Sequence, residues 1–209
     1  MVNMPEDAPR AYISFSAEIN PNTTESLISV MANRANSRVQ QVYLLLSTLG
    51  GQNVNGLNLY NVLKGMPFEL VTHNVGSVDS IGNMIILAGD RRYATASATF
   101  MFHGVGFTLS QNQRLEQKDV YDKLDSILSD QKRIGNIISQ DTDLTEDEIA
   151  GLFKEAQTEE AGFAIDKGRI HEIREVQISP GCLIISLLFQ AANNLIHPFC
   201  VTSGDTYGR

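Results

Sequence analysis

The sequence predicts an α/β fold with a mainly parallel sheet, and three features support this prediction. Short apolar runs of β character alternate with segments of helical periodicity over the first half of the chain. Glycine-containing turns follow two of the predicted strands, at residues 48–53 and 76–82. From residue 110 the pattern changes to a long amphipathic helix in a charged background. With 209 residues, 43% of them hydrophobic, the chain can bury a substantial core, and we expect a single domain over residues 1–209.

The charge pattern and the cysteine content argue against several classes of protein. The net charge of −8, without a basic stripe, argues against a nucleic-acid partner, because phosphate backbones are bound by clustered Lys and Arg. The two cysteines, Cys182 and Cys200, lack a CxxC neighbour, so we expect neither a metal site nor a disulfide framework. Neither a P-loop nor a dinucleotide-binding glycine motif occurs, and we expect no cofactor.

No segment predicts a targeting signal or a membrane span. Residues 1–10 are acidic and polar with two prolines, lack the apolar core of a signal peptide, and are expected to be flexible. The most apolar run, residues 183–189, is far shorter than the roughly 20 residues that cross a bilayer. We therefore expect a cytoplasmic protein with no membrane partner.

The first predicted strand covers residues 12–16, and Asn22 is the expected N-cap of the helix after it. The nearly continuous apolar run at residues 42–47 is typical of a strand buried on both faces. The turn at residues 48–53 then leads into a helix. Its expected buried positions are Val54, Leu57, Leu59, Tyr60 and Leu63.

The strand–turn–helix pattern then repeats. A strand at residues 68–72 leads through the turn at residues 76–82 into an apolar helix at residues 80–87. Two short strands follow, at residues 92–94 and 98–102. Because strands alternate with helices through tight turns, we expect parallel strands joined by crossover helices.

The second half is predicted to be more helical. Apolar residues at three- and four-residue steps predict a helix of about eight turns over residues 110–139, which projects from its sheet or packs on another subunit. The capping box at residues 145–148 begins a shorter helix. Thr158 is the expected cap of a further short helix that ends near Gly168.

Toward the end of the chain, the alternation of strands and helices is less regular. Residues 170–173 are expected to form a last strand. After the break at Pro180 and Gly181, residues 183–195 are expected to form a terminal apolar helix or an oligomer contact.

The turn at residues 76–82 (GSVDSIG) places Ser80 where a strand changes into a helix. A hydroxyl there lies near unpaired N–H groups and the positive end of the helix dipole, which suits a nucleophile that develops negative charge. A serine in this position can equally act only as an N-cap. For Ser80 alone, both interpretations stay open.

Two neighbouring features bear on Ser80. Adjacent glycines such as Gly50 and Gly51 let backbone N–H groups approach a substrate oxygen, as in an oxyanion hole, although they also occur in tight turns without a ligand. His103 ends a predicted strand, where a histidine is either structural or a general base. Since strands of an open α/β sheet end at a common edge, Ser80 and His103 are expected in one cleft, with imidazole close to hydroxyl.

With these residues, the chain resembles the family of Clp protease proteolytic subunits, within the wider Clp–crotonase fold. The resemblance extends from about residue 12 to residue 173. The order and spacing of several motifs carry the resemblance. They are residues 42–51, 76–82, 99–103 and 110–139, and the segment with Ala161, Ala164 and Gly168. The resemblance implies stacked ββα units with a mainly parallel sheet, and a protruding handle helix at residues 110–139 that joins two heptameric rings in the family.

The resemblance also implies roles for individual residues. Ser80 corresponds to the nucleophile and His103 to the general base, and the N–H groups of Gly51 and Ile81 correspond to the oxyanion hole. The family's aspartate falls at Ala156 in this chain. Its neighbour Glu155 is the expected substitute, unless it is simply a solvated helix residue, in which case a Ser–His dyad remains.

Two further departures from the family are visible. Leu49 stands where the family's glycine turn has a proline, and residues 174–209 form a C-terminal extension of unknown role that the resemblance does not cover.

The resemblance predicts a serine-type peptidase that hydrolyses peptides or unfolded proteins within a homo-oligomeric heptameric ring or stacked double ring, alone or with a Clp-type ATPase. Two alternatives stay open. One is a crotonase-like enzyme acting on acyl-CoA thioesters, for which Asp79 is the acid within the serine turn. The other is a ring subunit without catalytic activity, which the missing aspartate favours.

Overall fold

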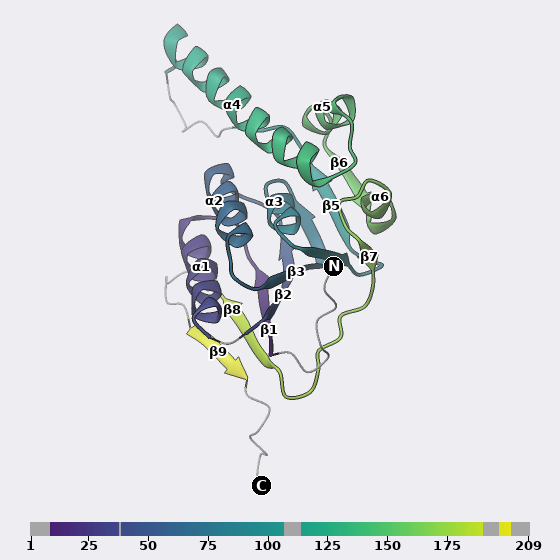
Figure 1. Ribbon diagram of the computed structural model, residues 1–209. Helices are drawn as coiled ribbons and strands as arrows, with labels where there is room; N and C mark the ends of the chain where they lie inside the picture. Colours follow the sequence, from purple (N-terminus) through teal and green to yellow (C-terminus); the bar gives the residue numbers. More distant parts are fainter. Residues whose placement is uncertain (1–8, 38, 107–113, 190–196, 202–209) are drawn as a thin grey trace.

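The computed structural model describes residues 9–37, 39–106, 114–189 and 197–201 (Figure 1). Its helices are α1 (Pro21–Ala35), α2 (Asn53–Lys64), α3 (Gly82–Leu87), α4 (Gln117–Asp141), α5 (Glu146–Lys154) and α6 (Ala161–Asp166). Its strands are β1 (Arg10–Ser16), β2 (Gln41–Thr48), β3 (Glu69–Asp79), β4 (Arg91–Ala94), β5 (Thr99–Phe102), β6 (Gln157–Glu160), β7 (Glu172–Ile173), β8 (Leu183–Leu188) and β9 (His197–Val201).

The described strands form one sheet in the order β6-β5-β3-β2-β1-β8-β9, with β4 paired to β3 and β7. Of the described strands, only β6 and β9 run antiparallel to their neighbours. Helices α1, α2 and α3 lie side by side against one face of this sheet (Figure 1). The predicted α/β class with a mainly parallel sheet is confirmed.

The hydrophobic core lies between these three helices and the sheet, and it continues to buried residues of α4, α5 and α6. From β2 it receives Val42, Leu44 and Leu46, all fully buried, whereas the alternate side chains Tyr43 and Leu45 are only half-buried. The prediction that this strand is buried on both faces was therefore correct for one face only. Successive side chains of a strand point to opposite faces, and the described helices α1, α2 and α3 cover one of them.

Strand β3 is longer than its apolar run predicted, because it continues through Gly76 to Asp79. Its first part pairs with β4 and its last three residues pair with β5, both in parallel. Gly76 permits this continuation, since a Cβ there would lie 2.9 Å from the hydroxyl of Ser47. The predicted glycine turn is thus confined to the residues around Ser80, directly after the strand.

Two helix starts differ from the sequence predictions, and a third agrees with them. The N-cap of α1 is Asn20, whose side chain accepts a hydrogen bond from the amide of Thr23, so Asn22 lies inside the helix. Helix α4 begins at Gln117, and residues 114–116 before it are not helical. The predicted start at residue 110 falls outside the described residues. The capping box before α5 is present, with Thr145 as N-cap.

Helix α4 projects from the sheet, as its length predicted (Figure 1). Its 25 residues span about 37 Å at 1.5 Å per residue. Ile134 and Ile138, near its C-terminal end, are buried, whereas Val120, Leu124 and Leu128 nearer its start are exposed. No helix within the described ranges combines the length and the apolar character that a membrane span requires.

Near the C-terminus, one predicted helix begins later than expected, with Glu160 instead of Thr158 at its N-cap position, and another is a strand. Residues 157–160 form β6, paired antiparallel with β5, and the short helix α6 begins only after Glu160. Residues 183–188 form β8, which pairs in parallel with β1 and carries β9 on its other side. Ile185 and Leu187 of β8 join the core, so this segment extends the sheet. The remainder of the predicted terminal helix, residues 190–195, lies outside the described residues.

Candidate active site

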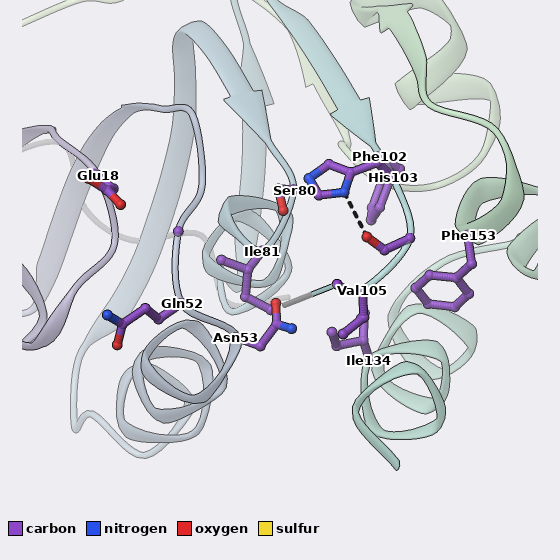
Figure 2. A pocket seen from close by; sticks show the side chains of 13 residues that line it. Glu18, Gln52, Asn53, Ser80, Ile81, Phe102, His103, Val105, Ile134 and Phe153 are labelled. Carbon is purple, nitrogen blue, oxygen red and sulfur yellow. Dashed lines mark hydrogen bonds between the residues drawn. The ribbon is translucent and has the colours of Figure 1, made fainter. Parts of the chain in front are cut away.

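A cavity of about 580 Å³ opens at the carboxyl ends of the central strands (Figure 2). The turn after β2, the Ser80 turn and the segment after β5 contribute to its wall, and Ile134 of α4 and Phe153 of α5 complete it. Four of the five residues singled out from the sequence, namely Ser80, His103, Gly51 and Ile81, line this cavity.

Ser80 lies in the tight turn between β3 and α3. Its φ of 55° is the only positive value among the described non-glycine residues, and such a left-handed conformation costs a serine about 1 kcal/mol or more. The amide of Ser80 donates to the carbonyl of Met101 on β5, at 2.7 Å. The strained backbone is thus held by the neighbouring strand, and the half-buried side chain lies on the cavity wall.

The turn after β2 packs directly on the serine turn. Gly50 and Gly51 both have positive φ, of 89° and 149°. A Cβ on Gly50 would lie 2.6 Å from the Cβ of Ser80, and a Cβ on Gly51 would lie 2.1 Å from the carbonyl oxygen of Ile19. Neither position has room for a side chain, so the two glycines bring this backbone against the serine.

Two backbone N–H groups at this junction have no protein acceptor within the described residues. Around Gly51, the amide of Gly50 donates to the hydroxyl of Thr48 and that of Gln52 donates to the carbonyl of Ile19, but the amide of Gly51 makes no such bond. The same holds for the amide of Ile81, which follows Ser80. These are the two donors expected from the sequence.

His103 follows β5, the strand that pairs in parallel with the end of β3, and therefore reaches the same edge of the sheet as Ser80. Figure 2 shows its imidazole beside Ser80 at the cavity, with a hydrogen bond of 2.7 Å between Nδ1 and the carbonyl oxygen of Gly104. A carbonyl only accepts, so Nδ1 carries the ring proton. A neutral imidazole of this tautomer keeps a lone pair on Nε2.

The structure does not bring Glu155 to His103. Glu155 is the exposed C-cap of α5, does not line the cavity, and accepts a hydrogen bond of 3.0 Å from the side chain of Gln157. The expectation that it orients the histidine therefore has no support in the geometry. Ala156, at the position of the family's aspartate, provides no carboxylate either.

The acid within the serine turn is also engaged elsewhere. The carboxylate of Asp79 is buried and accepts a hydrogen bond of 2.5 Å from the hydroxyl of Ser77, two residues earlier on β3. Asp79 does not line the cavity. It therefore offers no general acid or base to a ligand bound there.

The cavity contains residues that the sequence did not suggest. Glu18, in the segment after β1, is exposed at one side of it, and Gln52 and Asn53 lie at the start of α2 (Figure 2). The position of Glu18 at a strand's carboxyl end was a usable signal, since ligands bind at that edge of an open α/β sheet. Ile134 and Phe153 carried no such signal, because their place depends on how α4 packs against α3 and α5 packs against α4.

Comparisons with known proteins agree with the fold. The sequence profile of the Clp protease family matches residues 8–177. ATP-dependent Clp protease proteolytic subunit 1 of Leifsonia xyli subsp. xyli is 27% identical over 160 residues, which cover 74% of this chain and 77% of that protein. ATP-dependent Clp protease proteolytic subunit 2 of Thermobifida fusca is 30% identical over 95 residues, 43% of this chain and 47% of that protein.

A similar solved structure is that of a ClpP1 point mutant from Listeria monocytogenes. It superposes with a TM-score of 0.71 over 79% of this chain and 92% of that chain, at 18% sequence identity. At that identity the likeness concerns the fold.

Proposed function

The chain belongs to the Clp protease family, a family of serine peptidases, and we propose that it hydrolyses peptide bonds with Ser80 as nucleophile and His103 as general base. One observation carries the proposal. A serine in a strained turn and a histidine line one cavity beside two backbone N–H groups, and neither Nε2 of the histidine nor these N–H groups have a hydrogen-bond partner among the described residues. This is the set of groups that acyl transfer to a hydroxyl requires.

The proposed reaction has two halves. In the first, Nε2 of His103 takes the hydroxyl proton of Ser80 while the oxygen attacks the peptide carbonyl carbon, and the amides of Gly51 and Ile81 donate to the resulting oxyanion. His103 then gives this proton to the leaving amine, and the C–N bond breaks. In the second half, water gives a proton to Nε2 of His103 while its oxygen attacks the ester carbon. The bond between this carbon and the Ser80 oxygen breaks, and His103 returns the proton to that oxygen, which restores Ser80 and releases the acid.

The Gly104 carbonyl takes over one task of the missing aspartate. Its hydrogen bond with Nδ1 selects the tautomer of His103 that accepts a proton at Nε2. A neutral carbonyl stabilises the imidazolium that forms during attack less than a carboxylate does. We therefore propose a Ser–His dyad that is slower than a complete triad.

The proposed chemistry is tested by labelling with a serine-reactive fluorophosphonate, followed by mass spectrometry of the modified peptide. We expect an adduct on Ser80 that is absent in Ser80→Ala and at least about 10³-fold slower in His103→Ala. The matched control is Ser97→Ala, which removes an exposed serine between β4 and β5. An adduct that persists in Ser80→Ala, or a folded wild-type protein that does not react, would refute the assignment.

We further propose that the chain works in a ring of copies, a heptamer or a stacked pair of heptamers, in which α4 is the handle helix. Val120, Leu124 and Leu128 recur at four-residue steps on α4 and are exposed in the isolated chain, which leaves an apolar stripe for another subunit. Native mass spectrometry of the wild type and of Leu124→Asp tests this. A monomeric wild type would contradict it.

The relatives' name, ATP-dependent Clp protease proteolytic subunit, also suggests the partner. The sequence has no P-loop, so we propose that ATP hydrolysis is carried out by a separate Clp-type ATPase that delivers unfolded protein. Stimulation of protein degradation, but not of short-peptide hydrolysis, by such an ATPase and ATP is the expected result.

One alternative function has an observation in its favour. Ala156 and the outward position of Glu155 leave His103 without a carboxylate partner in the described part of the chain, as expected for a ring subunit that has lost activity. The labelling experiment separates the two, because an inactive subunit would fold and assemble without forming the adduct. The acyl-CoA alternative has no comparable support, since the carboxylate of Asp79 is turned to Ser77.

A further inference from the structure

Arg169, in the segment between α6 and β7, is among the most completely buried side chains of the described structure, at 2% exposure. Its guanidinium carbon lies 4.9 Å and 4.5 Å from the ring centroids of Phe100 and Phe102 on β5. It forms an ion pair with Glu159 on β6, whose side chain is 9% exposed. A charged group in such a place is costly unless it is fully paired.

The second guanidinium nitrogen of Arg169 is connected to the serine turn by hydrogen bonds through Asn83. It donates to the side-chain oxygen of Asn83 at 2.8 Å. The amide nitrogen of the same Asn83 side chain donates to the carbonyl of Ser80 at 3.0 Å and to that of Met101 at 3.1 Å. Arg169 is thus one residue removed from the backbone of the proposed nucleophile.

The same arginine contacts the strand that ends at His103. Glu159 pairs with Phe100 across the antiparallel β5–β6 ladder, and Phe102, under the guanidinium, directly precedes the histidine. Arg169 therefore connects both halves of the proposed dyad through buried contacts, without lining the cavity itself.

Burial lowers the pKa of Arg169 to about 10, and Glu159 opposes this, so the guanidinium remains charged at neutral pH. A buried ion pair of this kind adds little net stability, since replacing it by apolar side chains of similar volume is often neutral or stabilising. We therefore expect the ion pair to contribute to the geometry of the serine turn more than to the free energy of unfolding. Ser80 has a strained backbone, which persists only where surrounding contacts fix it.

We propose that Arg169, together with Glu159 and Asn83, is a positioning residue that holds the Ser80 turn against the His103 strand. The inference rests on the proposed function for its effect on rate, but the arrangement of the turn can be measured independently. Because catalysis is sensitive to displacements of about 1 Å, loosening this link is expected to lower the rate constant without changing substrate binding.

The test uses the full-length double variant Glu159→Leu/Arg169→Met, which removes both buried charges together. We expect it to fold, to react with the fluorophosphonate about 10- to 100-fold more slowly, and to lower kcat for a fluorogenic peptide while KM stays within about twofold. Hydrogen–deuterium exchange of the peptide containing the Ser80 amide should be at least about tenfold faster, because that amide is bonded to Met101.

The matched control is Glu69→Leu/Arg91→Met, which removes an Arg–Glu pair with an N–O distance of 2.7 Å at the opposite end of β3. Both the labelling and the exchange of the Ser80 peptide should stay at the wild-type level in this control. If the Arg169 double variant unfolds, Arg169→Lys serves instead. Its single ammonium cannot reach Glu159 and Asn83 with the same fork, and an intermediate loss is expected.

Unchanged labelling and exchange in a folded Arg169 variant would overturn the proposal, as would an equal loss in the control. If the folded wild type does not react with the fluorophosphonate, the peptidase function is refuted. If the Ser80 peptide nevertheless exchanges faster in the Arg169 variant than in the wild type, the positioning role remains supported. Neither result can be mistaken for the other.

Discussion

The two sides of the cavity are held very differently. On the serine side, the amide of Ser80 is bonded to Met101, and its carbonyl accepts from both the backbone and the side chain of Asn83. Two glycines complete the packing, because a Cβ on Gly50 would overlap Ser80 and a Cβ on Gly56 would lie 2.2 Å from the side chain of Ile81.

On the histidine side, the imidazole is exposed, and its one hydrogen bond within the described part of the chain is to the carbonyl of the next residue, Gly104. Gly104 packs closely, since a Cβ there would lie 2.5 Å from the carbonyl oxygen of Phe153. The histidine side chain itself has no partner from another element among these residues. The fold therefore determines the position of the nucleophile more strongly than that of its base.

The largest effect is expected from disturbing the well-held side. In Gly50→Ala, the new Cβ would come within 2.6 Å of the Cβ of Ser80 at a φ of +89°, so the serine turn must move. Catalysis that depends on sub-ångström placement should fall by about 10²-fold or more, measured as the fluorophosphonate reaction rate per folded molecule. Gly162→Ala is the control, because nothing lies within 4 Å of its Cβ position. Equal rates in Gly50→Ala and wild type would show that the serine side is not fixed in this way.

A smaller and opposite effect is expected from strengthening the weakly held side. The β5–β6 ladder pairs Phe102 with Gln157, and continuing this register by one residue sets Ala156 opposite His103. Side chains directly opposite each other on antiparallel strands lie about 4.5–5.5 Å apart at Cβ, so an aspartate there can reach the imidazole. We expect Ala156→Asp to raise kcat about tenfold for a fluorogenic peptide, because a carboxylate stabilises the imidazolium.

Two variants show whether charge at that position is the cause. Ala156→Asn has the same size without the charge and should give little of the gain, whereas Glu155→Gln should leave the rate unchanged, because Glu155 faces Gln157. If Ala156→Asp is no faster than Ala156→Asn, the orientation of the histidine does not limit the rate.

Much of the fold around the cavity could be predicted from the sequence. Apolar runs located β1, β2 and the start of β3, and parallel strand order implied that Ser80 and His103 end at one edge. The extent of β3 could not be predicted, because Gly76 is equally typical of a turn and of a strand residue in close contact with a neighbour, here Ser47.

The remaining differences also have physical causes. The apolar run at residues 183–188 is too short for periodicity to separate a buried helix from a strand, and pairing with β1 decided the outcome. The role expected of Glu155 depended on how residues 155–160 face β5. The antiparallel register between β5 and β6 determines which way these residues face. A register depends on tertiary contacts, so no local sequence pattern predicts it.

The smallest effect is expected from a second histidine, His73. A variant of this residue shows whether stability and activity depend on pH through different groups. His73 of β3 is buried, and its Nε2 lies 3.0 Å from the carbonyl oxygen of Arg174. Burial is the main cause that lowers the pKa of His73 below its ordinary value of 6.5. The unfolded chain then binds this proton more readily than the folded chain, so stability is full above about pH 6.5 and declines as the pH falls toward the folded pKa.

His73→Gln removes this proton-binding group while keeping a donor for the Arg174 carbonyl. We expect the urea midpoint of the wild type to fall between pH 7.5 and pH 5.5, and the fall to be smaller in the variant. The decline of activity in acid should be the same in both proteins, because His73 does not line the cavity. If His73→Gln also shifted the acid limb of kcat, the two sides of the cavity would be coupled through β3, and the contrast between a fixed nucleophile and a locally held base would have to be abandoned.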